Sequence, residues 1–164
     1  MAAAITFADG TELSLPTTVL KSIHAHMNRK GFRIESGGIL LGTRSTVSPS
    51  FEITHASLPS RFDVAHKFSF IRKKDPANDK IRSAWVNSGG TVNYLGEWHT
   101  HDESLPVPST VDRQLINQVI KDKACSFDRV FMLILGNDGT AFIGVANPNE
   151  STGFYDSKYI DWCL

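Results

Sequence analysis

The chain has 164 residues, a length typical of one domain, and 41% of them are hydrophobic, which is enough for a buried core. Seventeen basic residues balance seventeen acidic ones, so no basic surface for nucleic acid is expected. No apolar run approaches a membrane span, and the opening MAAAITFADG lacks the features of a signal peptide, so we expect a cytoplasmic protein without a membrane partner. Cys125 and Cys163 are too far apart in sequence to suggest a disulfide framework or a cysteine-rich metal site.

The first half of the chain predicts a hairpin, a helix and buried strands. The helix is indicated by Val19, Ile23 and Met27, which recur at helical spacing. The expected elements are a hairpin over 5–15 with its turn at Asp9-Gly10, a helix over 16–31, strands over 37–46 and 51–59, and a strand joined to a loop over 60–75.

The second half predicts two helices among further strands. The expected elements are a helix over 76–88, a strand over 91–101, a loop over 102–108, a helix over 109–123, and a hairpin of strands over 129–136 and 140–147. Core-facing positions of the helix over 109–123 are expected to be Val111, Leu115, Ile116 and Val119, and the tail aromatics Phe154, Tyr155, Tyr159 and Trp162 are expected to pack onto the domain. Strands and helices are mixed along the chain, which favours an α/β sandwich around one sheet.

Alternation along the strand over 91–101 assigns its side chains to two faces. We expect Val92, Tyr94, Gly96 and Trp98 on one face, and Asn93, Leu95, Glu97, His99 and His101 on the other.

Two histidines end this strand. Residues two apart on a strand point the same way, so His99 and His101 project together, as two imidazole nitrogens at about 2.0–2.1 Å from one cation would require. Asp112 follows a proline-stiffened loop, in the first turn of a predicted helix. Two imidazoles, one carboxylate and one open position are typical of a catalytic zinc site.

The same residues have simpler interpretations. Paired histidines on a strand can be polar surface residues, and Ser109 with Asp112 fits a helix-capping box. For Ser109 and Asp112 alone the capping interpretation is favoured. The combination His-x-His-x7-Ser-x2-Asp in one chain favours the metal site.

A water molecule activated by zinc needs a general base. Glu97 shares the strand face of the histidines, whereas Glu35 opens the segment ESGGILLG, just before a buried strand. Local geometry favours Glu97, and the residues by themselves leave both candidates open.

The segment ESGGILLG followed by GEWHTHDESLPVPSTVD resembles the JAMM (MPN-plus, JAB-domain) zinc metalloprotease family. The likeness extends over residues 30–145 or so, and the motif is specific. It implies that residues 1–164 form a single JAB/MPN domain, a cytidine-deaminase-like sandwich with a central mixed sheet flanked by helices. Carried over by position, it implies one zinc ion held by His99, His101 and Asp112, Glu35 as general base and acid, Ser109 as oxyanion donor, and Glu97 as a neighbour.

The resemblance also implies a substrate class. The family hydrolyses amide bonds, most often the isopeptide bond after the C-terminal glycine of ubiquitin or a ubiquitin-like protein. The compact chain is similar to the free-standing bacterial branch of deubiquitinase-like peptidases, which accompany ubiquitin-activating and ubiquitin-conjugating-like enzymes. Some members of that branch serve in anti-phage (CBASS) operons, where they release a CD-NTase-type cyclic-oligonucleotide synthase from its conjugates.

Details of the substrate groove are expected from the same resemblance. A protein tail bound in extended form can add to an exposed strand edge beside the zinc, with segments 58–75 and 102–108 as groove walls. Asp102 stands where many members have proline, and it adds negative charge near the mouth of the site.

Four alternatives compete with this interpretation. Within the family, the enzyme could process a sulfur-carrier or other ubiquitin-like precursor. A non-catalytic MPN scaffold typically loses ligands, whereas all five motif positions are kept here. A zinc deaminase would need His-x-Glu and Cys-x-x-Cys, and this chain has no Cys-x-x-Cys. The related DNA-repair branch usually carries an added helical DNA-binding region, for which a neutral chain of 164 residues is too short.

Overall fold

The computed structural model describes residues 2–59, 64–66, 69–71, 74–121, 126–150 and 153–162. In chain order the elements are β1 (Ala2–Thr6), β2 (Glu12–Pro16), α1 (Thr17–Lys30), β3 (Gly37–Arg44), β4 (Ser50–Ala56), β5 (Val64–His66), β6 (Ser69–Ile71), α2 (Lys74–Asn87), β7 (Asn93–Thr100), α3 (Thr110–Lys121), β8 (Val130–Leu135), β9 (Thr140–Ala146) and β10 (Phe154–Asp161). Most predicted elements are confirmed to within a few residues. Within the segment predicted as a strand and a loop, β5 pairs antiparallel with β6, and the rest of 60–73 lies outside the described residues, as do Cys125 and Cys163.

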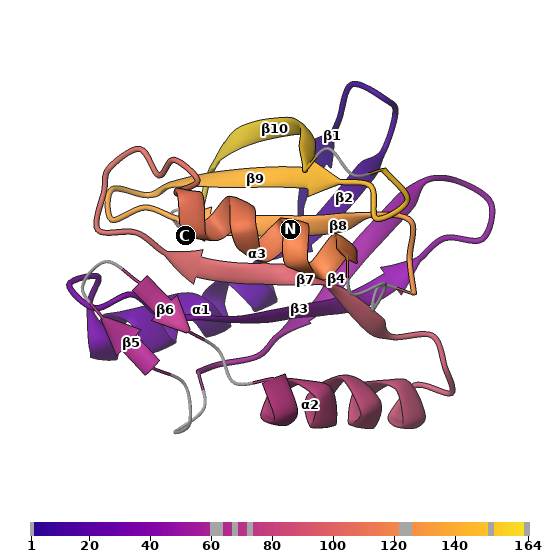
Figure 1. Ribbon diagram of the computed structural model, residues 1–164, viewed down its shortest axis with the longest axis horizontal. Helices are drawn as coiled ribbons and strands as arrows, with labels where there is room; N and C mark the ends of the chain where they lie inside the picture. The colour runs from indigo at the N-terminus through magenta and orange to yellow at the C-terminus, as the bar shows by residue number, and fades with distance from the viewer. Residues whose placement is uncertain are drawn as a thin grey trace.

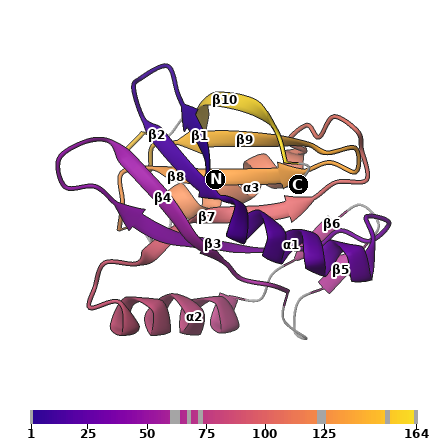
Figure 2. The ribbon, with the colours of Figure 1, turned by 180° about the vertical axis from the view of Figure 1, so that it is seen from behind.

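The centre of the fold is one mixed sheet, with its strands in the order β1-β2-β4-β3-β7-β8-β9-β10. The pairs β2–β4 and β7–β8 are parallel, and the other pairs are antiparallel. Helices α2 and α3 lie over one face of the sheet (Figure 1), and α1 lies over the other (Figure 2). The predicted α/β class, with a central mixed sheet flanked by helices, is confirmed. No helix in the described part of the chain is long and apolar enough to cross a membrane.

In helix α1, the apolar residues that recur at helical spacing pack against the sheet. Val19, Ile23 and Met27 are buried together with Leu20, and they form one apolar stripe against the sheet. The helix ends at Gly31, whose backbone has φ +72° and whose N–H donates to the Met27 carbonyl. Glycine adopts this conformation at little cost, so the helix ends at the glycine that the sequence predicted as its stop.

The predicted face assignment of β7 is wrong in its first half. The register against β3 slips where Leu40 pairs with Gly96 and Leu41 pairs with Tyr94, which leaves Leu95 as an extra residue. As a result, Leu95 shares a core cluster with Trp98, and Tyr94 belongs to the cluster on the other face. A Cβ at Gly96 would lie 1.8 Å from the Phe131 carbonyl oxygen, so only glycine fits at the bulge.

Helix α3 turns inward the predicted stripe except at its first position, Val111. Asp112, Ile116 and Ile120 are buried, four residues apart, whereas Val111 is 52% exposed. Leu115 and Val119 pack against the same core cluster as partly buried residues. The prediction that Val111 faces the core is wrong, because the carboxylate of Asp112 takes the inward position of the first turn.

The tail forms a strand that the sequence analysis did not predict. Residues 154–161 pair antiparallel with β9 as β10, with an irregularity near Phe154. Trp162 is buried in the core on the α1 side, and Phe154 packs against Phe142. The expectation that the tail aromatics pack back is confirmed for these two, whereas Tyr159 keeps about half of its surface exposed while its ring contacts Phe142.

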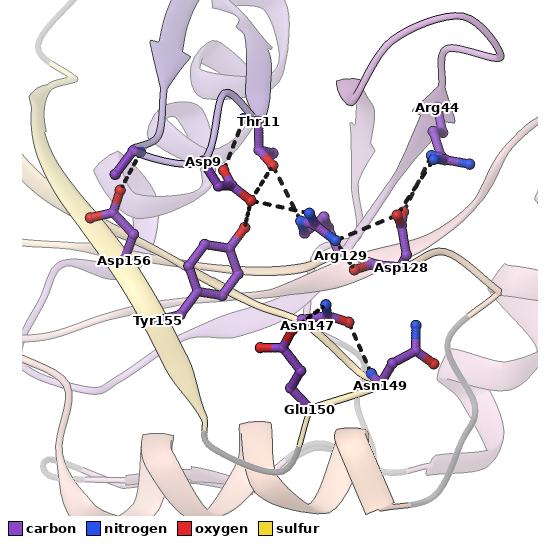
Figure 3. A network of polar contacts seen from close by, with 11 residues as sticks. Asp9, Thr11, Arg44, Asp128, Arg129, Asn147, Asn149, Glu150, Tyr155 and Asp156 are labelled. Atoms are coloured by element: carbon purple, nitrogen blue, oxygen red, sulfur yellow. Dashed lines mark hydrogen bonds and ion pairs between the residues drawn. The ribbon is translucent and has the colours of Figure 1, made fainter.

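A polar network joins the two edges of the sheet (Figure 3). The Tyr155 hydroxyl on β10 donates to Asp9 Oδ2 at 2.8 Å, and Arg129 Nη2 reaches the same oxygen at 3.1 Å. The backbone N–H of Ala8 donates to Asp156 Oδ2 at 2.7 Å. The β1–β2 turn is thereby fastened to the last strand.

Replacing Asp9 with asparagine should lower the free energy of unfolding by about 1 kcal/mol at pH 7, because charged hydrogen bonds at a partly exposed site are lost. Burial alone would raise the pKa of Asp9, but hydrogen bonds from Thr11, Tyr155 and Arg129 lower it from 3.8 to about 2. A depressed carboxyl pKa stabilises the fold above the unfolded value and loses this effect as the pH falls through the folded value. The difference between wild type and variant in urea unfolding should therefore be full at pH 7 and shrink between about pH 4 and pH 2. An equal difference at both pH values would contradict this role of Asp9.

Candidate metal centre and its surroundings

The structure brings His99, His101 and Asp112 together. His99 lies near the end of β7 and His101 directly after it, and Asp112 lies in the first turn of α3. Their ligand atoms all lie within 4.8 Å of one another, and all three residues are buried. Asp112 Oδ1 is 2.7 Å from His99 Nε2, and Asp112 Oδ2 is 3.2 Å from His101 Nε2.

This donor set fits a metal ion. His99 Nε2 is buried and, despite its 2.7 Å approach to Asp112, makes no hydrogen bond of acceptable geometry in the described part of the chain. The two imidazole rings stack with centroids 5.5 Å apart, and both present a nitrogen to the carboxylate of Asp112. A buried nitrogen without a hydrogen-bond partner is costly, and a cation bound among these atoms would satisfy it.

The protonation state of Asp112 suits a cation as well. Burial would raise the pKa of Asp112, but the contacts of His101 and His99 hold it well below its usual range. Burial would lower the pKa of His101, but the hydrogen bond and charge of Asp112 raise it, so a proton on this ring must leave when the nitrogen binds a metal. The carboxylate is therefore ionised at neutral pH, which is the state in which it can bind a metal.

Ser109 and Asp112 form a reciprocal cap at the start of α3. The Ser109 N–H donates to Asp112 Oδ2 at 2.6 Å, and the Asp112 N–H donates to Ser109 Oγ at 3.2 Å. The capping geometry that the sequence suggested is thus present. A hydroxyl that accepts one hydrogen bond still has its own proton to donate, so the cap is compatible with a second role for Ser109.

Glu35 lies beside this cluster, although it is 64 residues before His99 in the chain. Pairing of β3 with β7 places Gly37 opposite His99, which brings the preceding residues alongside the histidines. Burial raises the pKa of Glu35, and the nearby charges of His101 and His99 oppose that rise. A half-buried carboxyl close to both histidines has the position and the raised pKa expected of a proton acceptor.

Glu97 has different surroundings. It is 2% exposed, and its Oε1 accepts the Tyr94 hydroxyl at 2.7 Å. The bulge places Glu97 on the face of Tyr94, and therefore on that of the histidines, as predicted. A carboxylate enclosed among core residues is poorly placed to exchange protons with a substrate, so the geometry favours Glu35 over Glu97.

The loop 102–108 lies beside the cluster. Asn137 fixes it, donating from its side chain to Asp102 Oδ1 at 2.9 Å and from its backbone to the Glu103 carbonyl at 2.8 Å. Pro106 and Pro108 are buried, whereas Leu105 and Val107 are about half exposed. The loop predicted as a groove wall therefore presents two partly exposed apolar side chains. The other predicted wall, 58–75, lies mostly outside the described residues.

Sequence analysis missed a buried pair that links the Glu35 segment to β7. The Thr100 N–H donates to the Ser36 carbonyl at 2.9 Å, and the Ser36 N–H donates to Thr100 Oγ1 at 3.0 Å. No spacing signal marks these two residues, since only the β3–β7 pairing brings them together.

Comparisons with known proteins agree with this geometry. A family model described as prokaryotic homologs of the JAB domain matches residues 16–151. A protein of Pseudomonas aeruginosa named CD-NTase/cGAS isopeptidase is 33% identical over 109 residues, covering 66% of this chain and 68% of that protein. Proteins of the same name from Escherichia coli (41% over 78 residues, covering 48% of this chain and 49% of that protein) and Vibrio cholerae (32% over 102 residues, covering 62% of each) are also similar.

A solved structure shares the fold. The solution structure of a protein from Desulfitobacterium hafniense aligns with a TM-score of 0.51 at 18% identity, covering 79% of this chain and 85% of that protein. At this level of identity the likeness concerns the arrangement of the chain.

Proposed function

The chain belongs to the prokaryotic homologs of the JAB domain, and from this premise we propose that it is a zinc-dependent isopeptidase that cleaves the amide bond after the C-terminal tail of a ubiquitin-like protein. The observation that carries the proposal is the buried cluster of His99, His101 and Asp112, with the carboxyl of Glu35 beside it. We also propose that residues 1–164 form one cytoplasmic domain with a cytidine-deaminase-like sandwich.

The proposed setting is anti-phage defence. Relatives named CD-NTase/cGAS isopeptidase support a conjugate of a CD-NTase-type synthase as the substrate, made by ubiquitin-activating and ubiquitin-conjugating-like enzymes. The alignments cover between 49% and 68% of these relatives' own lengths, so the substrate is part of the proposal. Processing of a sulfur-carrier precursor remains the alternative within the family, and a non-catalytic scaffold remains the alternative outside catalysis.

The proposed mechanism assigns one role to each side chain. His99, His101 and Asp112 would hold the zinc ion, which would supply Lewis acidity to the scissile carbonyl and acidify the attacking water. Glu35 accepts a proton from that water as its oxygen attacks the carbonyl carbon. The carbon–nitrogen bond then breaks, and Glu35 delivers the proton to the departing amine. Ser109 donates a hydrogen bond from its hydroxyl group to the oxygen that becomes negatively charged.

Cleavage of defined substrates tests the proposal. The purified protein, supplied with zinc, is incubated with ubiquitin-like proteins joined through their C-terminal glycine to a lysine side chain, and products are identified by intact mass spectrometry. We expect release at the isopeptide bond and complete loss of release with a chelator. Zinc binding without cleavage of any such conjugate would favour the scaffold.

Replacing Ser109 with alanine should reduce the rate by about 100- to 1000-fold, since one donor to the oxyanion is lost. Loss of the cap should also lower the free energy of unfolding by about 1 kcal/mol. Turnover and urea unfolding are measured on the same preparation, with the exposed neighbour variant Thr110→Ala as control. Full activity with only the stability loss would mean that Ser109 is a helix cap and nothing more.

A further inference from the structure

We propose that three buried side chains, Thr100, Ser36 and His26, position the Glu35 carboxyl against the metal ligands. The inference rests on the proposed function, because it assigns these residues a role in placing the general base. None of the three touches the scissile bond in the mechanism above, so each is a positioning residue.

The first part of the device is the reciprocal pair between Thr100 and Ser36. Thr100 lies between His99 and His101, is fully buried, and both donates its N–H to the Ser36 carbonyl and accepts the Ser36 N–H at its Oγ1. Two hydrogen bonds in opposite directions fix both the distance and the orientation of the Ser36 backbone. The residue next to the base is thereby fastened to the residue between the ligands.

The second part sets the direction of the Glu35 side chain. Ser36 Oγ lies 3.4 Å from Nε2 of His26 on α1, so the Ser36 side chain lies on the α1 side of the sheet. The Glu35 carboxyl is close enough to the two histidines and Asp112 to interact with their charges, so it lies on the opposite side, where α3 carries Asp112. Holding Ser36 toward α1 therefore keeps Glu35 turned toward the metal ligands.

His26 is a polar residue on the otherwise apolar inner stripe of α1. It is 8% exposed and lies among Ile23 and Met27. Burial lowers the pKa of His26, and the charges of Arg29 and Lys30 add to this effect, so the ring is neutral at pH 7. A neutral imidazole in this position serves as a hydrogen-bond partner for the Ser36 hydroxyl rather than as a charge.

The segment that carries Glu35 needs such support. Residues 32–36 belong to no helix or strand, and Ile34 is about half exposed. Regular structure begins only at Gly37. Between that strand and Glu35, the contacts of Ser36 are the restraints nearest to the general base. A misplacement of about 1 Å in a reacting group can cost on the order of 100-fold in rate.

Paired variants at Thr100 and His26 test whether these residues position Glu35. Thr100→Val removes the Oγ1 acceptor with little change of shape, and Thr100→Ser keeps it. His26→Leu removes the partner of Ser36, and His26→Gln keeps a polar group near Nε2. The measurements are kcat and KM on the ubiquitin-like conjugate that the wild type cleaves, zinc affinity by chelator competition, and amide hydrogen exchange of Ser36 in the metal-free protein.

For Thr100→Val we expect kcat to fall about tenfold, with KM and zinc affinity within about twofold of wild type and faster exchange at the Ser36 amide. His26→Leu should lower kcat in the same way, and Thr100→Ser and His26→Gln should restore most of it. Thermal unfolding of each variant confirms that the comparison is between folded proteins.

Two results would overturn the inference. One is wild-type kcat in both Thr100→Val and His26→Leu. The other is zinc affinity that falls in step with kcat, since Thr100 would then act on the ligand strand and not on Glu35. If the wild type cleaves no conjugate, the proposed function fails separately. The restraint of Ser36 by Thr100 is then tested by amide hydrogen exchange at Ser36. An unchanged exchange rate in Thr100→Val would refute it.

Discussion

Replacing His101 with alanine should remove the bound metal and abolish hydrolysis. One of three protein ligands is lost. Mutating a residue that only supports a ligand typically lowers metal affinity 10- to 100-fold, and losing a ligand should lower it more. Asp112 would also lose the partner that lies 3.2 Å away, which leaves a buried carboxylate less well compensated. Metal content by mass spectrometry and turnover on the same samples provide the measurement, with about one zinc per wild-type chain and none in the variant.

A histidine elsewhere on the sheet serves as the control for this experiment. His55 on β4 is exposed, and its Nδ1 contacts Thr54 Oγ1, so His55→Ala should keep both metal and activity. His101→Asn provides a polar replacement in case the alanine variant does not fold. Equal zinc content in wild type and folded His101 variants would show that the cluster is not the metal site.

Replacing Glu35 with glutamine should leave the metal in place and reduce turnover by about 100- to 10,000-fold, the range that a general acid–base group contributes. The amide matches the shape of the carboxylate but cannot accept and return a proton. Zinc content, kcat and KM separate this outcome from a loss of metal, because only kcat should change strongly.

Glu97→Gln distinguishes the two carboxylates that the sequence left open. Its amide can still contact the Tyr94 hydroxyl, so we expect turnover to stay much closer to wild type than in Glu35→Gln. The reverse pattern, with Glu35→Gln active and Glu97→Gln inactive while both bind zinc, would assign the base to Glu97.

Much of the fold could be predicted because its elements carry local signals. Helix α1 has its apolar stripe and its glycine stop, and β8 and β9 are continuous apolar runs around a turn. Strand β10 was missed because it lies at the sheet edge, with mostly exposed or partly exposed residues and no clean alternation. The burial of Asp112 in place of Val111 could not follow from hydrophobic periodicity, which ranks valine above aspartate at an inward position.

The candidate site also has residues that could be predicted from the sequence and residues that could not. His99 and His101 could be placed on one side because residues two apart on a strand share a face. The choice between Glu35 and Glu97 could not be made from spacing, because the pairing of β3 with β7 is a long-range contact. The Thr100–Ser36 pair depends on that same contact, and neither residue type is unusual in a strand or loop.

The bulge in β7 has a consequence for how this gene can vary in length. The first half of the strand is held in phase with the core by Tyr94 and Leu95, and the second half is held in phase with α3 by the two histidines. Deleting one residue between Tyr94 and His99 would remove the bulge, and these two residues would keep their partners Leu41 and Gly37 and their side of the sheet. Length changes should therefore be tolerated in the turn at 45–49, which joins β3 to β4, whereas the segment between Tyr94 and His99 should tolerate the loss of one residue but not of two.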